Sequence, residues 1–260
     1  MASPTDFEPS VSSSPRVDGG GVMTGGGQQR AEEIAARLAD VRRRIAEAAA
    51  RAGRSRASVT LVAVSKLFDV SDVLAARRAG QSDFGESRAQ ELARKAREAG
   101  VGIRWHFVGR LQRNKVKDVV GVASLIHSVD RIELAEAIAE RARREERVQR
   151  VLVQVNVGDD PAKAGVRPED ALALVARVRE MDGIACEGLM TIPPLDVDPR
   201  PVFVALRELR DDLRERFPEV QHLSMGMSND FEVAVEEGAT IVRLGEAVFG
   251  PRPQPAERTP

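Results

Sequence analysis

Lys66 is the first residue whose chemistry needs an explanation, because it directly follows an apolar run, Thr60-Leu61-Val62-Ala63-Val64-Ser65, that predicts a β-strand. The chain has 39 lysines and arginines but only five lysines, so arginine supplies most of the basic charge. A guanidinium cannot form a Schiff base with a carbonyl compound, whereas a partly desolvated lysine amine can. Lys66 is therefore a candidate Schiff-base residue. The alternative is a lysine that extends its charge into solvent from a strand end.

Small residues and helix starts follow two predicted strands near the end of the chain, in residues 224–230 and 243–246. Loops of this kind commonly hold phosphate in barrels of alternating strands and helices, because backbone N–H groups and a helix dipole face the dianion. Ser228 would add a hydroxyl donor, and Gly245 would let the backbone approach closely. Taken singly, each of these residues is equally compatible with forming a loop or capping a helix.

A Schiff-base lysine and a phosphate site together indicate pyridoxal 5′-phosphate (PLP) as the cofactor. The aldehyde would condense with Lys66, and the phosphate would lie against Ser228 and the backbone amides of Gly245 and Glu246. Arg243 lies in the last predicted strand, where a cation near the pyridine nitrogen would keep that nitrogen unprotonated and weaken the electron sink. The alternative for Arg243 is an ion pair with a strand carboxylate such as Glu187.

Strand and helix signals alternate along the chain, which is the pattern of a parallel α/β fold. The predicted strands are 60–66, 83–85, 103–108, 124–129, 151–157, 184–191, 222–224 and 240–243. The predicted helices are 31–52, 70–79, 88–99, one from about 111, 131–146, 168–181, 201–217 and 229–237. Eight strands predict a single (β/α)8 TIM-type barrel with an extra N-terminal helix; an open, doubly wound sheet is the alternative. In a barrel, the residues after the strands meet at one face.

Composition restricts the classes of function. A chain of 260 residues with 42% hydrophobic residues can bury a full core, and its net charge of −1 gives no reason to expect a nucleic-acid partner. No apolar stretch reaches the ~20 residues needed to cross a bilayer, so we expect no membrane association. The single cysteine, Cys186, lies in a predicted strand and indicates a buried, inert thiol in a reducing compartment, which favours the cytoplasm.

The two ends of the chain differ from the rest in composition. Residues 1–27 are rich in Ser, Pro and Gly and predict a disordered N-terminal tail, without the basic start and apolar core of a signal peptide. Residues 28–250 form the predicted PLP-binding barrel. Residues 251–260 contain four prolines and predict a loose C-terminal tail.

Several motifs together resemble one known family. They are Val62–Lys66, Phe84–Glu86, Trp105–Lys115, His127–Asp130, Gln154–Val157, Lys163–Gly165, Gly188–Pro193, Leu223–Asp230 and Val242–Gly250. In this order and spacing they resemble the pyridoxal phosphate homeostasis protein family, a single-domain relative of the alanine racemase N-terminal barrel, over residues 31–250. The resemblance implies a PLP-binding barrel that buffers or delivers the cofactor and has no established catalytic turnover.

We predict a set of cofactor-binding residues and neither a catalytic residue nor a metal ligand. The set is Lys66 as the Schiff base, Ser87, Asn156, Met225, Ser228, Arg243, Gly245 and Glu246. Two of these depart from the family that the chain resembles. Ser87 stands where the family usually has Asn and reaches less far toward the cofactor ring. Glu246 stands where the family usually has Thr, and an ionised carboxylate would repel the phosphate unless the side chain turns to solvent.

Three functions remain open at this stage. The first is a non-catalytic PLP carrier in intracellular PLP homeostasis, a monomer with PLP-dependent apo-enzymes as candidate partners. The second is a PLP-dependent, racemase-like amino-acid enzyme with weak activity. The chain has no tyrosine, and no second, β-rich domain follows the predicted barrel, so the usual opposite-face base of alanine racemase is missing. The third is a Schiff-base aldolase that acts on a phosphorylated sugar.

Overall fold

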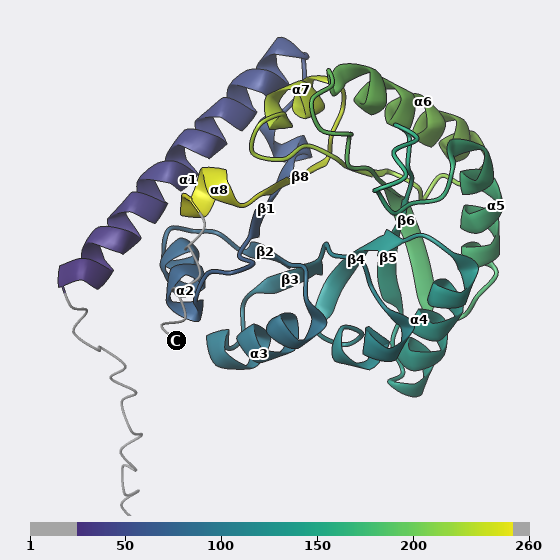
Figure 1. The fold of residues 1–260 in the computed structure, drawn as a ribbon, viewed down its shortest axis with the longest axis horizontal. Coiled ribbons are helices and arrows are strands. Elements are labelled where there is room, and N and C mark those ends of the chain that lie inside the picture. Colours follow the sequence, from purple (N-terminus) through teal and green to yellow (C-terminus); the bar gives the residue numbers. More distant parts are fainter. Residues whose placement is uncertain (1–24, 252–260) are drawn as a thin grey trace, which may run out of the picture.

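The computed structural model describes residues 25–251, and these residues form a closed barrel of eight parallel strands in chain order (Figure 1). The strands are β1 (Thr60–Val64), β2 (Asp83–Glu86), β3 (Arg104–Phe107), β4 (Ala123–Val129), β5 (Gln149–Gln154), β6 (Ile184–Met190), β7 (His222–Ser224) and β8 (Ile241–Leu244). The barrel closes because β1 pairs in parallel with β8, with Leu61 opposite Val242. The predicted (β/α)8 barrel is thus confirmed, and the open sheet is excluded.

Helices follow the strands on the outside of the barrel. They are α2 (Val70–Arg78), α3 (Ala89–Ala99), α4 (Ile132–Arg144), α5 (Pro168–Arg179), α6 (Arg200–Arg216), α7 (Phe231–Glu236) and α8 (Glu246–Phe249). Most observed bounds lie within one or two residues of the predicted ones. The helix expected from about residue 111 is instead a 3₁₀-helix, η2 (Arg113–Asp118), and the chain turns at Gly121 with φ of 84°. A second 3₁₀-helix, η1, spans Arg56–Ser58.

The extra N-terminal helix is present as α1 (Gly25–Arg51), which lies across the outside of the barrel beside α2, α7 and α8 (Figure 1). Its apolar residues Ile34, Leu38 and Ile45 are fully buried against these helices. The helix begins six residues earlier than predicted and includes the last three residues of the segment assigned to the N-terminal tail. The rest of that predicted tail, residues 1–24, and residues 252–260 lie outside the described part of the chain.

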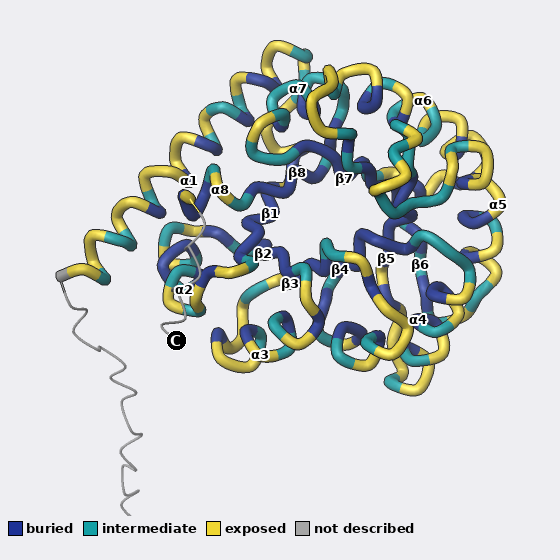
Figure 2. Tube along the Cα trace, viewed as in Figure 1, coloured by how far each residue is buried: buried dark blue, intermediate teal, exposed yellow. Residues whose placement is uncertain are grey.

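Two apolar layers hold the barrel together. The larger layer lies between the strands and the helices, and the smaller one lies inside the barrel around Val62, Leu125 and Met190. Figure 2 shows the buried residues concentrated along the strands and on the inner faces of the helices. Cys186 on β6 belongs to the outer layer, where burial raises the pKa of its thiol to about 11. The predicted burial of this thiol is confirmed, and the raised pKa disfavours the reactive thiolate.

One strand ends earlier than predicted because the loop that follows it leaves the sheet. The predicted strand 151–157 is β5, which ends at Gln154. The next residue, Val155, makes an isolated bridge with Val166 from the long loop before α5, and Asn156 N–H donates to the Val166 carbonyl. The backbone after β5 is thus held by the loop that precedes α5.

Candidate functional site

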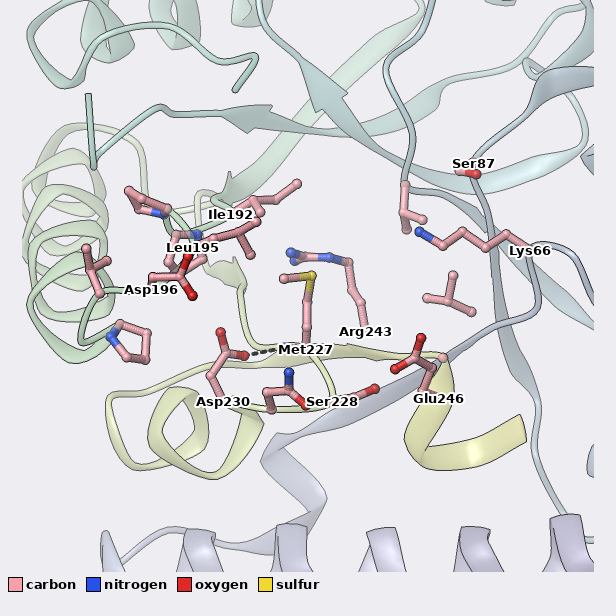
Figure 3. A pocket seen from close by; sticks show the side chains of 18 of the residues that line it. Lys66, Ser87, Ile192, Leu195, Asp196, Met227, Ser228, Asp230, Arg243 and Glu246 are labelled. Carbon is pink, nitrogen blue, oxygen red and sulfur yellow. Dashed lines mark hydrogen bonds between the residues drawn. The ribbon is translucent and has the colours of Figure 1, made fainter. Parts of the chain in front are cut away.

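A cavity of about 470 Å³ opens at the C-terminal ends of the strands, a volume within the roughly 300–1,000 Å³ typical of small-molecule sites. The predicted residues that line it are Lys66, Ser87, Ser228, Arg243, Gly245 and Glu246. Arg243 lies on β8 and the others follow the ends of β1, β2, β7 and β8, so the barrel brings together positions far apart in the sequence. Figure 3 shows Lys66 on one side of the cavity, Ser228 and Glu246 on another, and Arg243 between them.

Lys66 lies on a tight turn that is fixed at both ends. Ser65 N–H donates to the Gly85 carbonyl on β2 (2.9 Å), and Phe68 N–H donates back to the Ser65 carbonyl (3.0 Å). Leu67 has a φ of 70°, a left-handed conformation that is uncommon for a side chain of this size. The turn directs the Lys66 side chain into the cavity, where Figure 3 shows its amine pointing toward Arg243.

A buried ion pair supports this turn from below. The Nζ of Lys95 lies 2.6 Å from the Ser65 carbonyl oxygen, 2.6 Å from Glu86 Oε1 and 2.9 Å from Glu91 Oε1. The Ser65 hydroxyl also donates to Glu86 Oε1 (2.6 Å). Lys95 and Glu86 are both completely inaccessible to solvent. Burial raises the pKa of Glu86 even though Lys95 opposes the shift. These contacts fix the residue directly before Lys66.

Sequence reasoning missed the role of Lys95. Its helix has a strongly amphipathic pattern, in which a lysine is normally expected on the solvated face. Two signals pointed the other way: Lys95 is one of only five lysines, and it lies four residues after Glu91, the spacing at which helical side chains meet. Neither signal alone separates a buried lysine from a surface ion pair.

The loops after β7 and β8 meet at the side of the cavity next to the Lys66 turn, because β8 pairs with β1. The Ser228 hydroxyl accepts a hydrogen bond from the Ala247 N–H (3.2 Å), so the first loop covers the start of α8. Ser228 and Asn229 line the cavity, and their backbone N–H groups donate to no backbone carbonyl of residues 25–251. A Cβ on Gly245 would lie 3.3 Å from the Val64 carbonyl oxygen, so glycine allows β8 and β1 to approach closely here.

Glu246 begins α8 and lines the cavity, but the residue as a whole is exposed. Figure 3 shows its carboxylate beside the cavity, between Lys66 and Ser228. The side chain is thus at the rim, and it has not turned fully away from the proposed phosphate position. Any anion held by this loop would lie near a second negative charge.

Arg243 extends from β8 into the cavity and is only 5% exposed. Its Nη1 donates to the Ser224 hydroxyl (2.7 Å) and its Nη2 to the Thr191 carbonyl (3.0 Å). Burial lowers the pKa of the guanidinium to about 10, with Asp230 opposing the shift, so Arg243 stays a cation at neutral pH. The alternative ion pair with Glu187 is absent, because Glu187 instead pairs with Arg150 (2.6 Å).

Arg243 is also the end of a hydrogen-bond chain that crosses the barrel interior. The chain runs from Ser224 Oγ to His127 Nδ1 (2.8 Å), from His127 Nε2 to His106 Nδ1 (2.9 Å), and from His106 Nε2 to Asp83 Oδ1 (3.2 Å). His127 is fully buried, and burial followed by the charges of His106, Arg243 and His222 lowers its pKa well below the usual value. His127 is therefore neutral at physiological pH.

The groups at the two ends of this hydrogen-bond chain, Arg243 and Asp83, determine which ring nitrogen of each histidine carries the proton. A guanidinium only donates and an ionised carboxylate only accepts. Burial disfavours ionised Asp83, but hydrogen bonds from His106, Arg104 and Ser82 outweigh it and hold its pKa well below the usual range. The Ser224 hydroxyl, which accepts from Arg243, must then donate to His127 Nδ1. Both histidines consequently carry their proton on Nε2.

Two of the predicted cofactor-binding residues do not line the cavity. Met225 follows β7 on the outer face of the sheet, where its side chain is fully buried in the layer between strands and helices. Asn156 lies in the loop after β5, and its side chain donates to the Asp160 carbonyl (3.0 Å) and accepts from the Asp160 N–H (3.2 Å). Their structural positions do not support direct contact with a ligand in this cavity.

Other lining residues were missed by sequence reasoning. They are Val64, Phe68, Val108, residues 192–197, Pro199, Met227, Asn229 and Asp230. The segment 192–199 contains three prolines and covers the cavity on the side of α6 (Figure 3). A proline-rich run directly after the predicted sixth strand was the available signal, because residues after barrel strands face the mouth.

Comparisons with known proteins agree with this geometry. The family described as "Alanine racemase, N-terminal domain" matches residues 36–253. A pyridoxal phosphate homeostasis protein from Aquifex aeolicus is 46% identical over 221 residues, which cover 83% of this chain and 97% of that protein. The protein of the same name from Escherichia coli K12 is 38% identical over 227 residues, which cover 85% of this chain and 97% of that protein.

Solved structures with a similar fold include a protein with PLP bound and an alanine racemase. PipY from Synechococcus elongatus, in its structure with PLP bound, is 35% identical to this chain and has a TM-score of 0.74. The match covers 84% of this chain and 100% of the PipY chain. An alanine racemase from Clostridium difficile has 16% identity and a TM-score of 0.67 over 86% of this chain and 58% of its own, which shows the fold alone. The chain belongs to the pyridoxal phosphate homeostasis protein family, within the alanine racemase N-terminal domain family.

Proposed function

We propose that the protein binds PLP in the cavity at the barrel mouth and serves in intracellular PLP homeostasis as a non-catalytic carrier. The observation that carries this proposal is that Lys66 and the loops after β7 and β8 face the same cavity. The names of the relatives and the solved PipY structure with PLP bound support the choice of cofactor.

The residues of the cavity fit this cofactor. Lys66 supplies the amine that would form the Schiff base, and the N–H groups of Ser228 and Asn229 with the Ser228 hydroxyl supply donors for a phosphate. Arg243 supplies a buried cation between them, in place to face the pyridine nitrogen. Ser87 lines the cavity as well. When bound, PLP supplies an aldehyde that condenses with amines and a ring that withdraws electrons.

The proposed absence of catalysis rests on the groups available for proton transfer. A cation facing the pyridine nitrogen disfavours pyridinium formation and therefore weakens the electron sink. The sequence contains no tyrosine, so the two-base arrangement expected of a racemase lacks its partner to Lys66. A weak racemase-like activity is the second candidate function, because Lys66 alone is able to remove an α-proton and the fold is shared with alanine racemase.

Partners and localisation are part of the same proposal. We propose a cytoplasmic monomer that exchanges PLP with PLP-dependent apo-enzymes. Within residues 25–251, none of the helices combines the length and the apolar character needed to cross a bilayer. Cys186 as a buried, free thiol is compatible with a reducing compartment.

Loading with PLP followed by borohydride reduction tests the cofactor assignment. The loaded protein should be yellow, which a sugar-phosphate aldolase with the same lysine would not be. After reduction, peptide mass spectrometry should place the adduct on Lys66. Lys66→Ala should lose the adduct, whereas Lys117→Ala, an exposed lysine outside the cavity, should keep it. An adduct that persists on Lys115 or Lys163 in Lys66→Ala would refute the assignment.

A further inference from the structure

A second cavity, of about 830 Å³, lies next to the cofactor cavity and shares Ser87 with it. It is bordered by the start of α3, the end of β3 and the segment from Arg110 to Lys115. The motif Gly109–Lys115 follows β3 at the C-terminal face of the barrel, where barrels bind ligands. Apart from Ser87, none of these residues takes part in the cofactor cavity, so the motif needs a separate explanation.

Positive charge is concentrated around this second cavity. Arg88, Arg110, Arg113 and Lys115 line it and form no ion pair or side-chain hydrogen bond with any residue in 25–251. A fifth cation, Arg131, is paired with Asp130. No acidic residue is among those described that line the cavity. Like charges gathered without counter-charges repel one another, so this arrangement gains stability when an anion binds.

The N-terminus of α3 points into the same cavity. The helix has eleven residues, and its N-cap, Arg88, makes no side-chain capping bond. Ala89 and Gln90, whose N–H groups have no acceptor in the first turn of a helix, both line the cavity. The acidic residue of that turn, Glu91, is engaged elsewhere by Lys95 (2.9 Å) and the Leu67 N–H (3.3 Å). The positive end of the helix dipole thus adds to the four unpaired cations.

We propose that this second cavity binds a small phosphorylated anion that carries at least two negative charges. Guanidinium groups and free helix N–H groups match phosphate oxygens in both charge and geometry. The side-chain amides of Gln112 and Asn114 line the cavity and add donors for further oxygens. Because the four cations surround one cavity, a compact anion fits better than a polymer. The inference does not depend on PLP occupying the first cavity.

Calorimetric titration with pyrophosphate tests this site. The protein is first loaded with PLP, reduced with borohydride and freed of excess cofactor, and a second sample is used as purified. We expect pyrophosphate to bind both samples, more weakly at high salt. Arg113→Gln should weaken binding about tenfold, the loss expected for one charge-assisted contact. Arg97→Gln is the control: an exposed arginine on α3, the helix whose N-terminus borders the cavity, that lies outside the cavity and is unpaired within residues 25–251.

The following outcomes would contradict the proposed anion site in the second cavity. No pyrophosphate binding would refute it, and binding lost in the PLP-loaded, reduced sample would place the anion in the first cavity. Equal losses in Arg113→Gln and Arg97→Gln would indicate diffuse surface charge. A single-stranded RNA that binds more tightly than pyrophosphate and depends on Arg113 would assign the cavity to a polymer instead. Circular dichroism of Arg113→Gln, an exposed residue, checks that the variant is folded.

Discussion

The Nζ of Lys95 lies 2.6 Å from Oε1 of Glu86, and both side chains are completely buried beneath the turn that carries Lys66. The attraction between two charges in this position is offset by the cost of removing both from water. The geometrical effect of the ion pair is clear, because Lys95 also donates to the Ser65 carbonyl. The pair therefore fixes the backbone at the residue before the proposed Schiff base.

Removing one partner of this pair should be severely destabilising. Lys95→Met leaves Glu86 buried without its counter-charge, and we expect a loss of about 3–5 kcal/mol in the free energy of unfolding, measured by urea denaturation. The double variant Lys95→Met/Glu86→Leu should recover much of that loss. Glu91→Gln, which removes the more exposed carboxylate, serves as the comparison. A Lys95→Met protein within about 1 kcal/mol of wild type would contradict the ion-pair description.

The loop after β7 should contribute directly to PLP affinity. Ser228→Ala removes one hydroxyl donor and should weaken binding by about 0.5–1.5 kcal/mol in a titration of apo-protein. Ser58→Ala, in η1 outside the cavity, is the control and should leave affinity unchanged. Equal affinities for Ser228→Ala and wild type would mean that the phosphate lies elsewhere.

The carboxylate of Glu246 should weaken PLP binding. Glu246→Thr removes a negative charge beside the proposed phosphate position and adds a hydroxyl donor, so PLP should bind more tightly than to wild type. Glu246→Gln separates the two effects, since it removes the charge alone. If the same titration shows no gain for either variant, the carboxylate exerts no influence on the phosphate.

Stability should fall on mild acidification because of His127. Its pKa is depressed in the folded protein, so the unfolded chain binds more protons once the pH falls below about 6.5, and unfolding becomes easier. Between pH 7.5 and 5.5 this amounts to about 1 kcal/mol. His222, whose pKa burial also lowers, acts in the same direction. His127→Gln should show a smaller loss over this range by urea denaturation; an unchanged slope would exclude His127 as the source.

The hydrogen-bond chain predicts the tautomers of two histidines. His106 and His127 should both carry the proton on Nε2 at neutral pH, because Arg243 and Asp83 fix the direction of donation. Nitrogen chemical shifts in long-range ¹H–¹⁵N spectra distinguish the two tautomers. Ser224→Ala removes the donor to His127 Nδ1 and should perturb the shifts of His127 most. A proton on Nδ1 of His127 in the wild type would reverse the assignment.

Proton abstraction from amino acids should be slow. The chain has no tyrosine, and Arg243 would disfavour protonation of the pyridine nitrogen, so deuterium exchange at the α-carbon should stay near the rate with free PLP. This exchange is the sensitive measurement, since it detects proton removal without product release. Exchange far above the free-cofactor rate, and lost in Lys66→Ala, would establish an enzyme and support the racemase-like candidate.

The fold could be predicted from the sequence because apolar runs such as Thr60–Val64 and Ile184–Met190 alternate with segments of helical periodicity along the chain. Lys66, Ser228 and Gly245 were found for the same reason: a residue directly after a barrel strand faces the mouth. Met225 also follows a strand, but successive residues face opposite sides of a sheet, and after the buried Ser224 its side chain points outward. A three-residue strand is too short to reveal that alternation in the sequence.

The remaining differences arise from contacts distant in the sequence. Asn156 does not line the cavity: its backbone is held by Val166 and its side chain by Asp160, and these contacts have no local signature in the sequence. The partners of Arg243 lie on β6 and β7, and Glu187, a plausible partner by charge, is taken by Arg150. Charge alone does not identify which of several strand neighbours a side chain will meet.

The pairing of β1 with β8 has a consequence for the nascent chain. Lys66 leaves the ribosome early, whereas Ser228, Arg243 and Gly245 emerge with the last strands, and the cavity they share forms only when β8 pairs with β1. A growing polypeptide therefore cannot capture PLP at this site during most of its synthesis. PLP held by the whole cavity must therefore be acquired after β8 has paired with β1.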